Sequence, residues 1–201
     1  MESKTVTIGT MQFAIPEYFQ QVDSTPDAPP QSVPFMTKSE NALCLVIAYP
    51  IPPEFSMPLD SEVLASLMYD EIDKNQGLIQ VGAGKDHVFG IVKALKPEGG
   101  IQYILALERH YDEDTILRIQ GFFDEEGITG LRDTTVYELC RREGTVGSED
   151  DPFCGWREEL YDDSYAVEAQ KNLSEQEKYD EMFPAHPLSM CRAFVRTVTS
   201  S

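Results

Sequence analysis

Hydrophobic and polar residues alternate near the start of this 201-residue chain, which is typical of half-buried β-strands. The alternation covers residues 4–15 and shifts by one position at Gly9-Thr10. Glycine permits the backbone geometry of a tight turn or bulge at such a shift. We therefore expect two strands joined by a turn, ending near Pro16, because proline cannot donate a ladder hydrogen bond.

The middle of the chain carries four further candidate strands. Residues 20–38 are rich in Pro, Ser and Asp and predict a surface loop. The nearly continuous apolar run at residues 41–51 then predicts a central strand covered on both faces. Alternating runs at residues 87–95, 101–109 and 115–123, separated by turn-rich segments, predict an antiparallel meander.

Helical spacing of apolar residues occurs in three other stretches. Residues 60–74 predict a helix capped by Asp60 or Ser61. A second helix is expected between Thr129, as its cap, and Gly144, as its stop. Its buried side should comprise Ile128, Leu131, Val136, Leu139 and Cys140.

The last thirty residues predict two helical segments joined by a proline-rich turn. Ser174 and Glu177 have the spacing of a capping box, which indicates a short helix. A longer helix should begin at Pro187, since proline is favoured at the first helical position. Arg192 and Arg196 should stand together on a face other than the apolar one. We expect them to pair with the acids of the chain, and binding of a carboxylate or phosphate is the alternative.

This order of elements predicts an α/β (α+β) fold, in which a largely antiparallel sheet is flanked by helices. Residues 1–144 should form the core domain. Residues 145–201 should form an acidic C-terminal extension that contains aromatic residues and packs on this core.

The element order also resembles that of the Mog1/PsbP-like group of α/β/α sandwich proteins. The resemblance rests on "VTIGTMQFAIPEYF" at the head of the chain and on the helix "TGLRDTTVYELC", and it covers roughly residues 4–143. Members of that group are mostly binding or assembly proteins, including a small-GTPase binder and a photosystem subunit. The resemblance implies no functional residue, and residues 145–201, outside it, look like an extension peculiar to a bacterial subgroup.

The net charge of the chain indicates which classes of macromolecule it can bind. The formal net charge is −19, with a pI near 4.4. Such a chain repels nucleic acid and anionic lipid surfaces and favours a protein with a basic surface. The same charge can equally serve solubility alone, without any basic partner. The N-terminus lacks the features of a secretory signal, and no apolar run is long enough to span a bilayer, so we expect a cytoplasmic protein.

The motifs for common chemistries fail on inspection. The segment "VGAGKDH" has Ile79 where a phosphate loop needs glycine, and Asp86 where it needs Ser or Thr. The four cysteines are widely separated, so they predict reduced and mostly buried thiols rather than a metal site, with Cys154 the least explained. We therefore assign no catalytic residue, no metal ligand and no cofactor.

The acidic stretch with interleaved aromatic residues is the candidate partner surface, since such rings are enriched at interface cores. Its aromatic members are Phe153, Trp156, Tyr161 and Tyr165, and its acidic members are Asp150, Asp151, Glu158 and Glu159. The main hypothesis is a protein-binding or assembly module. The alternatives are a hydrolase-type enzyme with a site assembled from distant residues, and an acidic chaperone for an exported protein. The sequence also leaves open that the rings only anchor this stretch on its own domain, and that the protein is a homodimer.

Overall fold

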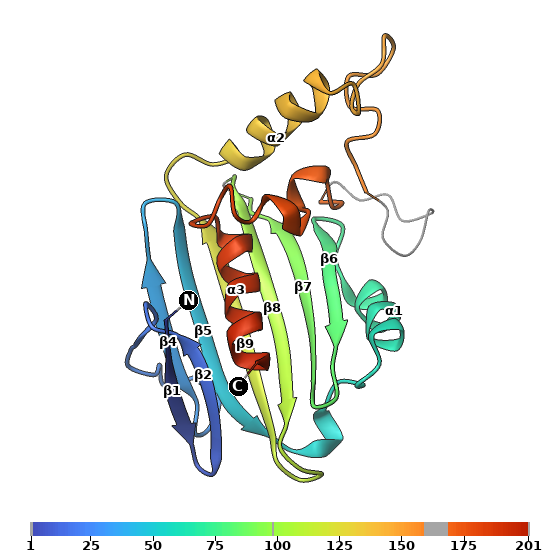
Figure 1. The fold of residues 1–201 in the computed structure, drawn as a ribbon. Coiled ribbons are helices and arrows are strands. Elements are labelled where there is room, and N and C mark those ends of the chain that lie inside the picture. The colour runs from blue at the N-terminus through green and yellow to red at the C-terminus, as the bar shows by residue number, and fades with distance from the viewer. Residues whose placement is uncertain (1, 98, 159–168, 201) are drawn as a thin grey trace.

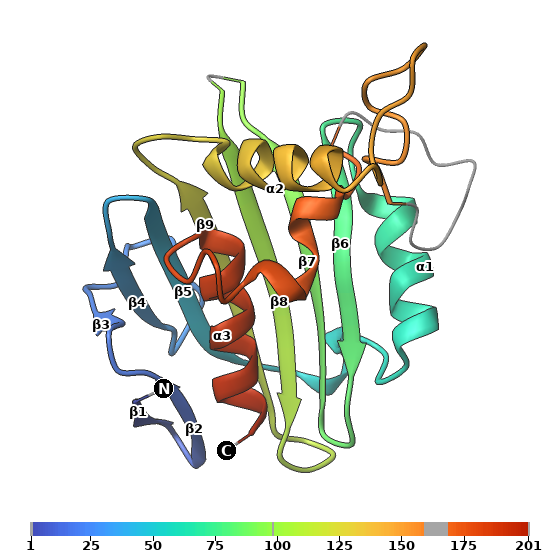
Figure 2. The same cartoon turned by 45° about the horizontal axis from the view of Figure 1, so that its top comes forward.

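The protein is built around a seven-stranded antiparallel sheet with helices on both faces, which confirms the α+β class (Figures 1 and 2). The computed structural model describes residues 2–97, 99–158 and 169–200. The strand order is β3-β4-β5-β9-β8-β7-β6. Its strands are β3 (Gln20–Gln21), β4 (Val33–Lys38), β5 (Ala42–Ile51), β6 (Gln76–Ala83), β7 (His87–Leu95), β8 (Ile101–His110) and β9 (Ile116–Glu125).

The N-terminal strand pair forms as expected. β1 (Ser3–Ile8) and β2 (Met11–Pro16) pair antiparallel, with Ile8 opposite Met11. Gly9 between them has a φ of 58°, a left-handed conformation that glycine adopts without steric cost. This hairpin forms a separate two-stranded sheet that packs on the C-terminal helix (Figure 1).

Three strands of the large sheet differ from the sequence expectation. The segment 20–38, expected as a loop, contains β3 and β4. Proline is tolerated there because β4 pairs on its outer side only with the two residues of β3, close to the sheet edge. β6 was also missed, since its two glycines and the bulge between Leu78 and Gln80 disrupt the alternation.

The meander β7–β8–β9 confirms the three predicted strands, and β5 joins it through β9. The expectation that β5 is covered on both faces was too strong. Alternate residues from Ala42 to Ala48 are fully buried, whereas Leu43, Leu45 and Ile47 between them are half-buried.

The first two predicted helices both form, but the second differs from the prediction in its first residues and in its buried side. Helix α1 (Ser61–Glu71) is capped by Asp60 and covers β6 and β7. Helix α2 (Leu131–Arg142) begins after Gly130, which has a φ of 72°, rather than at a Thr129 cap. The expected burial of Ile128 and Leu131 is wrong, because the start of α2 lies past the end of the sheet (Figure 1).

The C-terminal helix α3 (Pro187–Thr199) closes the main core, on the face of the sheet opposite α1. Ile91 packs in the cluster of α3, while its neighbour Val92 packs with α1, and adjacent strand residues point to opposite faces. Phe194 lies 5.2 Å from the ring of Phe19 and 6.4 Å from that of Phe123. Among the described residues, no helix is both long and apolar enough to cross a membrane.

The predicted capping box lies two residues earlier than expected. Asn172 caps the 3-10 turn Leu173–Glu175, and the Glu175 side chain accepts a hydrogen bond from the backbone N–H of Asn172. A second 3-10 turn covers Glu177–Tyr179. The side chain of Ser174 is buried, bonded to Asp133 and Asn172.

Candidate functional site

Residues 145–158, which we call the acidic loop, follow α2 and stand beyond the end of the sheet (Figure 2). The loop is held in one shape by its own hydrogen bonds. Gly147 N–H donates to the Cys154 carbonyl at 2.9 Å, and Ser148 N–H donates to the Asp151 carbonyl at 2.8 Å. The Asp151 carboxylate accepts from Phe153 N–H at 2.9 Å.

An aromatic cluster fixes the acidic loop to α2. The ring of Tyr137 on α2 lies 5.5 Å from Phe153 and 5.3 Å from Trp156, within the range of favourable ring pairs. The Tyr137 hydroxyl donates to the Pro152 carbonyl at 2.7 Å. Trp156 is half-buried in this cluster, whereas Phe153 remains 59% exposed. The loop therefore presents Phe153 to the outside.

The acidic residues of the predicted surface separate into two groups. Asp150 and Asp151 are exposed beside Phe153. Glu158 is engaged elsewhere, because it pairs with Lys171 at 3.1 Å and accepts from the Gln176 amide. The predicted members Glu159, Tyr161 and Tyr165 lie outside the described residues.

A cavity of about 780 Å³ lies between the acidic loop and the ends of β7 and β8. The loop contributes Asp151, Phe153, Cys154 and Trp156 to its wall, and the sheet contributes Lys93. Cys154 is exposed, unlike the three other cysteines, which are buried as predicted. The structure thus brings three predicted residues together and adds Tyr137 and Lys93, which sequence reasoning did not select. The sequence signal that could have pointed to Tyr137 is its place in the second predicted helix, directly after the buried Val136.

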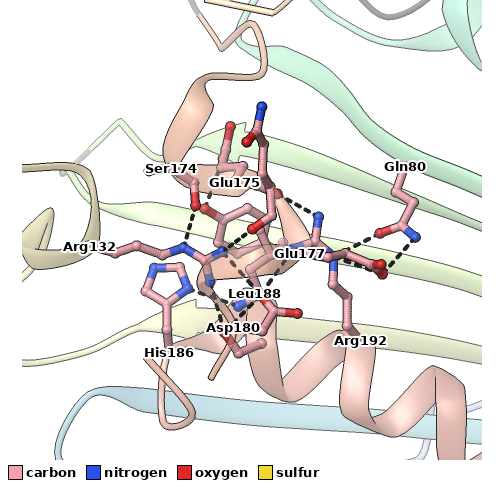
Figure 3. A network of polar contacts seen from close by, with 12 residues as sticks. Gln80, Arg132, Ser174, Glu175, Glu177, Asp180, His186, Leu188 and Arg192 are labelled. Atoms are coloured by element: carbon pink, nitrogen blue, oxygen red, sulfur yellow. Dashed lines mark hydrogen bonds and ion pairs between the residues drawn. The ribbon is translucent and has the colours of Figure 1, made fainter. Parts of the chain in front are cut away.

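A buried polar network joins α2, α3 and residues 172–180 (Figure 3). It adjoins the cavity through Lys93, Asp133 and Asn172. Arg132, only 1% exposed, donates to the Ser174 carbonyl at 2.7 Å, to the Ser189 hydroxyl at 2.8 Å and to Asp180 at 3.0 Å. Arg192 donates to the same Asp180 oxygen at 3.1 Å and to Gln80 at 2.7 Å. Arg192 therefore pairs with acids as expected, and it does so at a buried position.

The same network contains a buried ion pair between the end of β7, next to the edge strand β6, and the 3-10 turn Leu173–Glu175. Lys93 donates to Glu175 at 2.8 Å, and both side chains are at least 96% buried. The Tyr103 hydroxyl donates to the other Glu175 oxygen at 2.9 Å. Burial, and then the Glu175 charge, raise the pKa of Tyr103 well above its ordinary value. Burial, followed by Glu175, also raises the pKa of Asp133.

The partners of these charged groups indicate a structural role for the network. A buried charge is costly unless it is paired and hydrogen-bonded, and here each cation contacts a carboxylate or several carbonyls. The histidines lie beside carboxylates, at 3.0 Å for His87–Asp86, 3.7 Å for His110–Glu108 and 3.2 Å for His186–Glu125. The network mainly holds residues 172–186 against α2, α3 and β6–β8.

Comparison with known proteins gives a likeness of fold. No protein-family model matches the chain, and no curated protein matches it. Among solved structures, the chain is similar to the Ran-binding protein Mog1p of Saccharomyces cerevisiae. In fold, it resembles Mog1.

The match has 12% sequence identity and a TM-score of 0.46, and it covers 69% of this chain and 84% of the Mog1p chain. A mutant of the protein Mog1 matches with the same values. The Mog1/PsbP-like resemblance predicted from the element order is thereby confirmed, as a weak likeness of fold.

Proposed function

We propose that this protein is a cytoplasmic protein-binding module, and that its acidic loop docks on a basic surface of its partner. The observation that carries the proposal is Phe153, which is 59% exposed on a loop held by hydrogen bonds, beside the exposed carboxylates of Asp150 and Asp151. An exposed ring on a fixed loop loses little conformational freedom on binding, and such rings are common anchors of interfaces.

The charge of the molecule supports a basic partner. A net charge of −19 attracts cationic surfaces over a distance limited by salt screening. Charges at the edge of an interface mainly raise the association rate, and a central aromatic side chain contributes more to the lifetime of the complex. Asp150 and Asp151 would therefore mainly raise the association rate, and Phe153 would mainly lengthen the lifetime of the complex.

The test is affinity capture from a lysate of the source cells with wild-type protein and two single variants. Phe153→Ala removes the proposed anchor. Phe55→Ala is the matched control, because Phe55 is 65% exposed beside Glu54 in the 3-10 turn Pro53–Phe55. This turn connects β5 to α1 at the end of the sheet opposite α2 (Figure 1). Capture is compared at about 0.05 M and about 0.5 M salt, between which screening becomes strong.

The proposal expects one partner that wild type and Phe55→Ala retain at low salt, and that Phe153→Ala loses. The partner should also leave wild type at high salt. A partner retained equally by both variants would contradict the role of the acidic loop.

A further inference from the structure

A second, smaller pocket lies where β9 ends and α2 begins, against the turn that precedes α3. Its volume is about 170 Å³, similar to a cavity of roughly 150 Å³ that admits a benzene ring, so it holds a group of side-chain size. Its wall includes Glu125, Ile128, Leu131, Met182, Phe183 and His186. We infer that this pocket binds the side chain of a lysine from a partner protein.

The apolar part of the wall is unusually open to solvent. Ile128 is 76% exposed, and Leu131 and Met182 are each 53% exposed. Three large apolar side chains grouped around one hollow form the kind of surface that marks a binding site. The aliphatic stem of a lysine could cover them, since its methylene groups pack on apolar surface while the charge lies elsewhere.

The polar part of the wall carries a buried negative charge. Glu125 is 8% exposed, and one oxygen of its carboxylate contacts His186 Nε2 at 3.2 Å and the Gly130 N–H at 3.4 Å. The other oxygen is buried and has no hydrogen-bond partner among the residues that the structure describes. Leaving a buried carboxylate oxygen without a partner is costly, and a cation in the pocket would relieve that cost.

The histidine does not neutralise this charge. His186 caps α3, and its Nδ1 accepts a hydrogen bond from Leu188 N–H at 3.2 Å (Figure 3). An accepting Nδ1 carries no proton, so the single ring proton is on Nε2 and is donated to Glu125. Arg132, a cation that does line the pocket, directs its guanidinium to Ser174, Gln176, Ser189 and Asp180.

The number of free acceptors favours lysine over arginine. A guanidinium binds a carboxylate best through two oxygens, and one Glu125 oxygen is already occupied. An ammonium group is a point charge that one oxygen can satisfy. The choice of a partner's lysine rests on the proposed function, whereas the chemistry of the pocket does not depend on the acidic loop.

The test uses two small probes in an NMR titration of the full chain. One is lysine with an acetylated N-terminus and a methylamide C-terminus, and the other is norleucine with the same ends, which lacks the ammonium group. The readout is the shift of the methyl signals of Ile128, Leu131 and Met182. The variants are Glu125→Gln and its control Glu126→Gln, since Glu126 is adjacent and its carboxylate lies 3.7 Å from Lys38 at the surface.

The inference expects capped lysine to bind about tenfold more tightly than capped norleucine, as follows from one charged hydrogen bond. Glu125→Gln should abolish this difference, and Glu126→Gln should keep it. Equal binding of both probes, or no methyl shift with lysine, would overturn the inference. The wild-type comparison decides this even if Glu125→Gln fails to fold, and it leaves the test of the acidic loop unaffected.

Discussion

At the scale of single residues, the structure gives its charged side chains two different environments. Lys93 and Glu175 form a pair that is almost completely buried, at 2.8 Å. Lys38 and Glu126 form a surface pair at 3.7 Å, in which the lysine side chain is 64% exposed. Since solvent screens the second pair and not the first, the two should differ strongly in their effect on stability.

Replacement of Lys93 by methionine leaves the buried Glu175 without its cation. We expect Lys93→Met to lower the free energy of unfolding by roughly 3–5 kcal/mol, as broken buried pairs do. Lys38→Met should change it by less than about 1 kcal/mol. Urea unfolding followed by circular dichroism measures both, and similar losses in the two variants would contradict the structural role of the network.

Buried thiols predict how stability depends on alkaline pH. Burial raises the pKa of Cys44 to about 12 from an ordinary value of 9.0, with a smaller contribution from Asp124. The unfolded chain therefore loses this proton at lower pH than the native protein. The stabilising contribution is complete below pH 9.0 and is lost as the pH rises toward about 12.

The free energy of unfolding should thus fall with pH above about 9, by up to about 1.4 kcal/mol per pH unit for each such thiol. Cys44→Ala should reduce this slope, and Cys154→Ala, at an exposed position, should leave it unchanged. Urea titrations at several pH values between about 9 and 10.5 give the slopes. Equal slopes for wild type and Cys44→Ala would count against the buried thiol as the cause.

At the scale of elements, the sequence predicted those that alternate or repeat regularly. The hairpin β1–β2, the meander β7–β9 and the proline-initiated α3 each carry a clear period and a turn or cap signal. β4 and β6 were missed because prolines and glycines obscure their alternation, and pairing with long neighbours forms them nevertheless. Tertiary pairing is not visible to a local pattern.

The candidate sites were predictable to a smaller extent. The acidic loop was found because acids and aromatic residues alternate there, and Phe153 and Asp151 do lie together. The lysine pocket was not found, since Glu125 and His186 come from positions 61 residues apart, and a contact at that separation leaves no local signal. Ile128 and Leu131 carried the helical period of a buried face, but the sheet ends before it can cover them.

The division of the chain into a core domain and an extension at residue 144 stays a prediction. The contacts of helix α3 indicate how it can be tested. The helix supplies Leu188, Cys191, Phe194 and Val198 to the main core. A chain ending at residue 144 would expose the apolar side chains that they cover, on β2, β5, β8 and β9. We therefore expect the 1–144 fragment to show no cooperative urea transition, whereas the full chain shows one. A fragment with the same transition midpoint as the full chain would mean that residues 145–201 are an accessory extension.

At the scale of the whole molecule, the excess of acids over bases is a property of the surface. The chain has 35 acidic and 16 basic residues, and several of the bases, such as Arg132, Arg192 and Lys93, are buried against acids. Exposed arginines lie at the end of α2 and in the acidic loop, at Arg141, Arg142 and Arg157. The surface remains acidic because acids outnumber bases by 35 to 16 and only a few of either are buried in the described part of the chain. This charge distribution favours a basic partner without specifying where it binds, and exposed Phe153 is the proposed point of contact.

The measurement that tests this account most directly is the affinity of the purified captured partner for wild type and for two double variants, over a range of salt. Asp150→Asn with Asp151→Asn removes two charges beside Phe153. Asp23→Asn with Asp27→Asn removes two exposed charges between β3 and β4, with the same change in net charge.

The account predicts that the acidic-loop variant binds more weakly at low salt and depends less on salt than wild type, while the control variant follows wild type. If both double variants shift the affinity equally, only the net charge matters, and the proposal that the acidic loop is the binding site is contradicted.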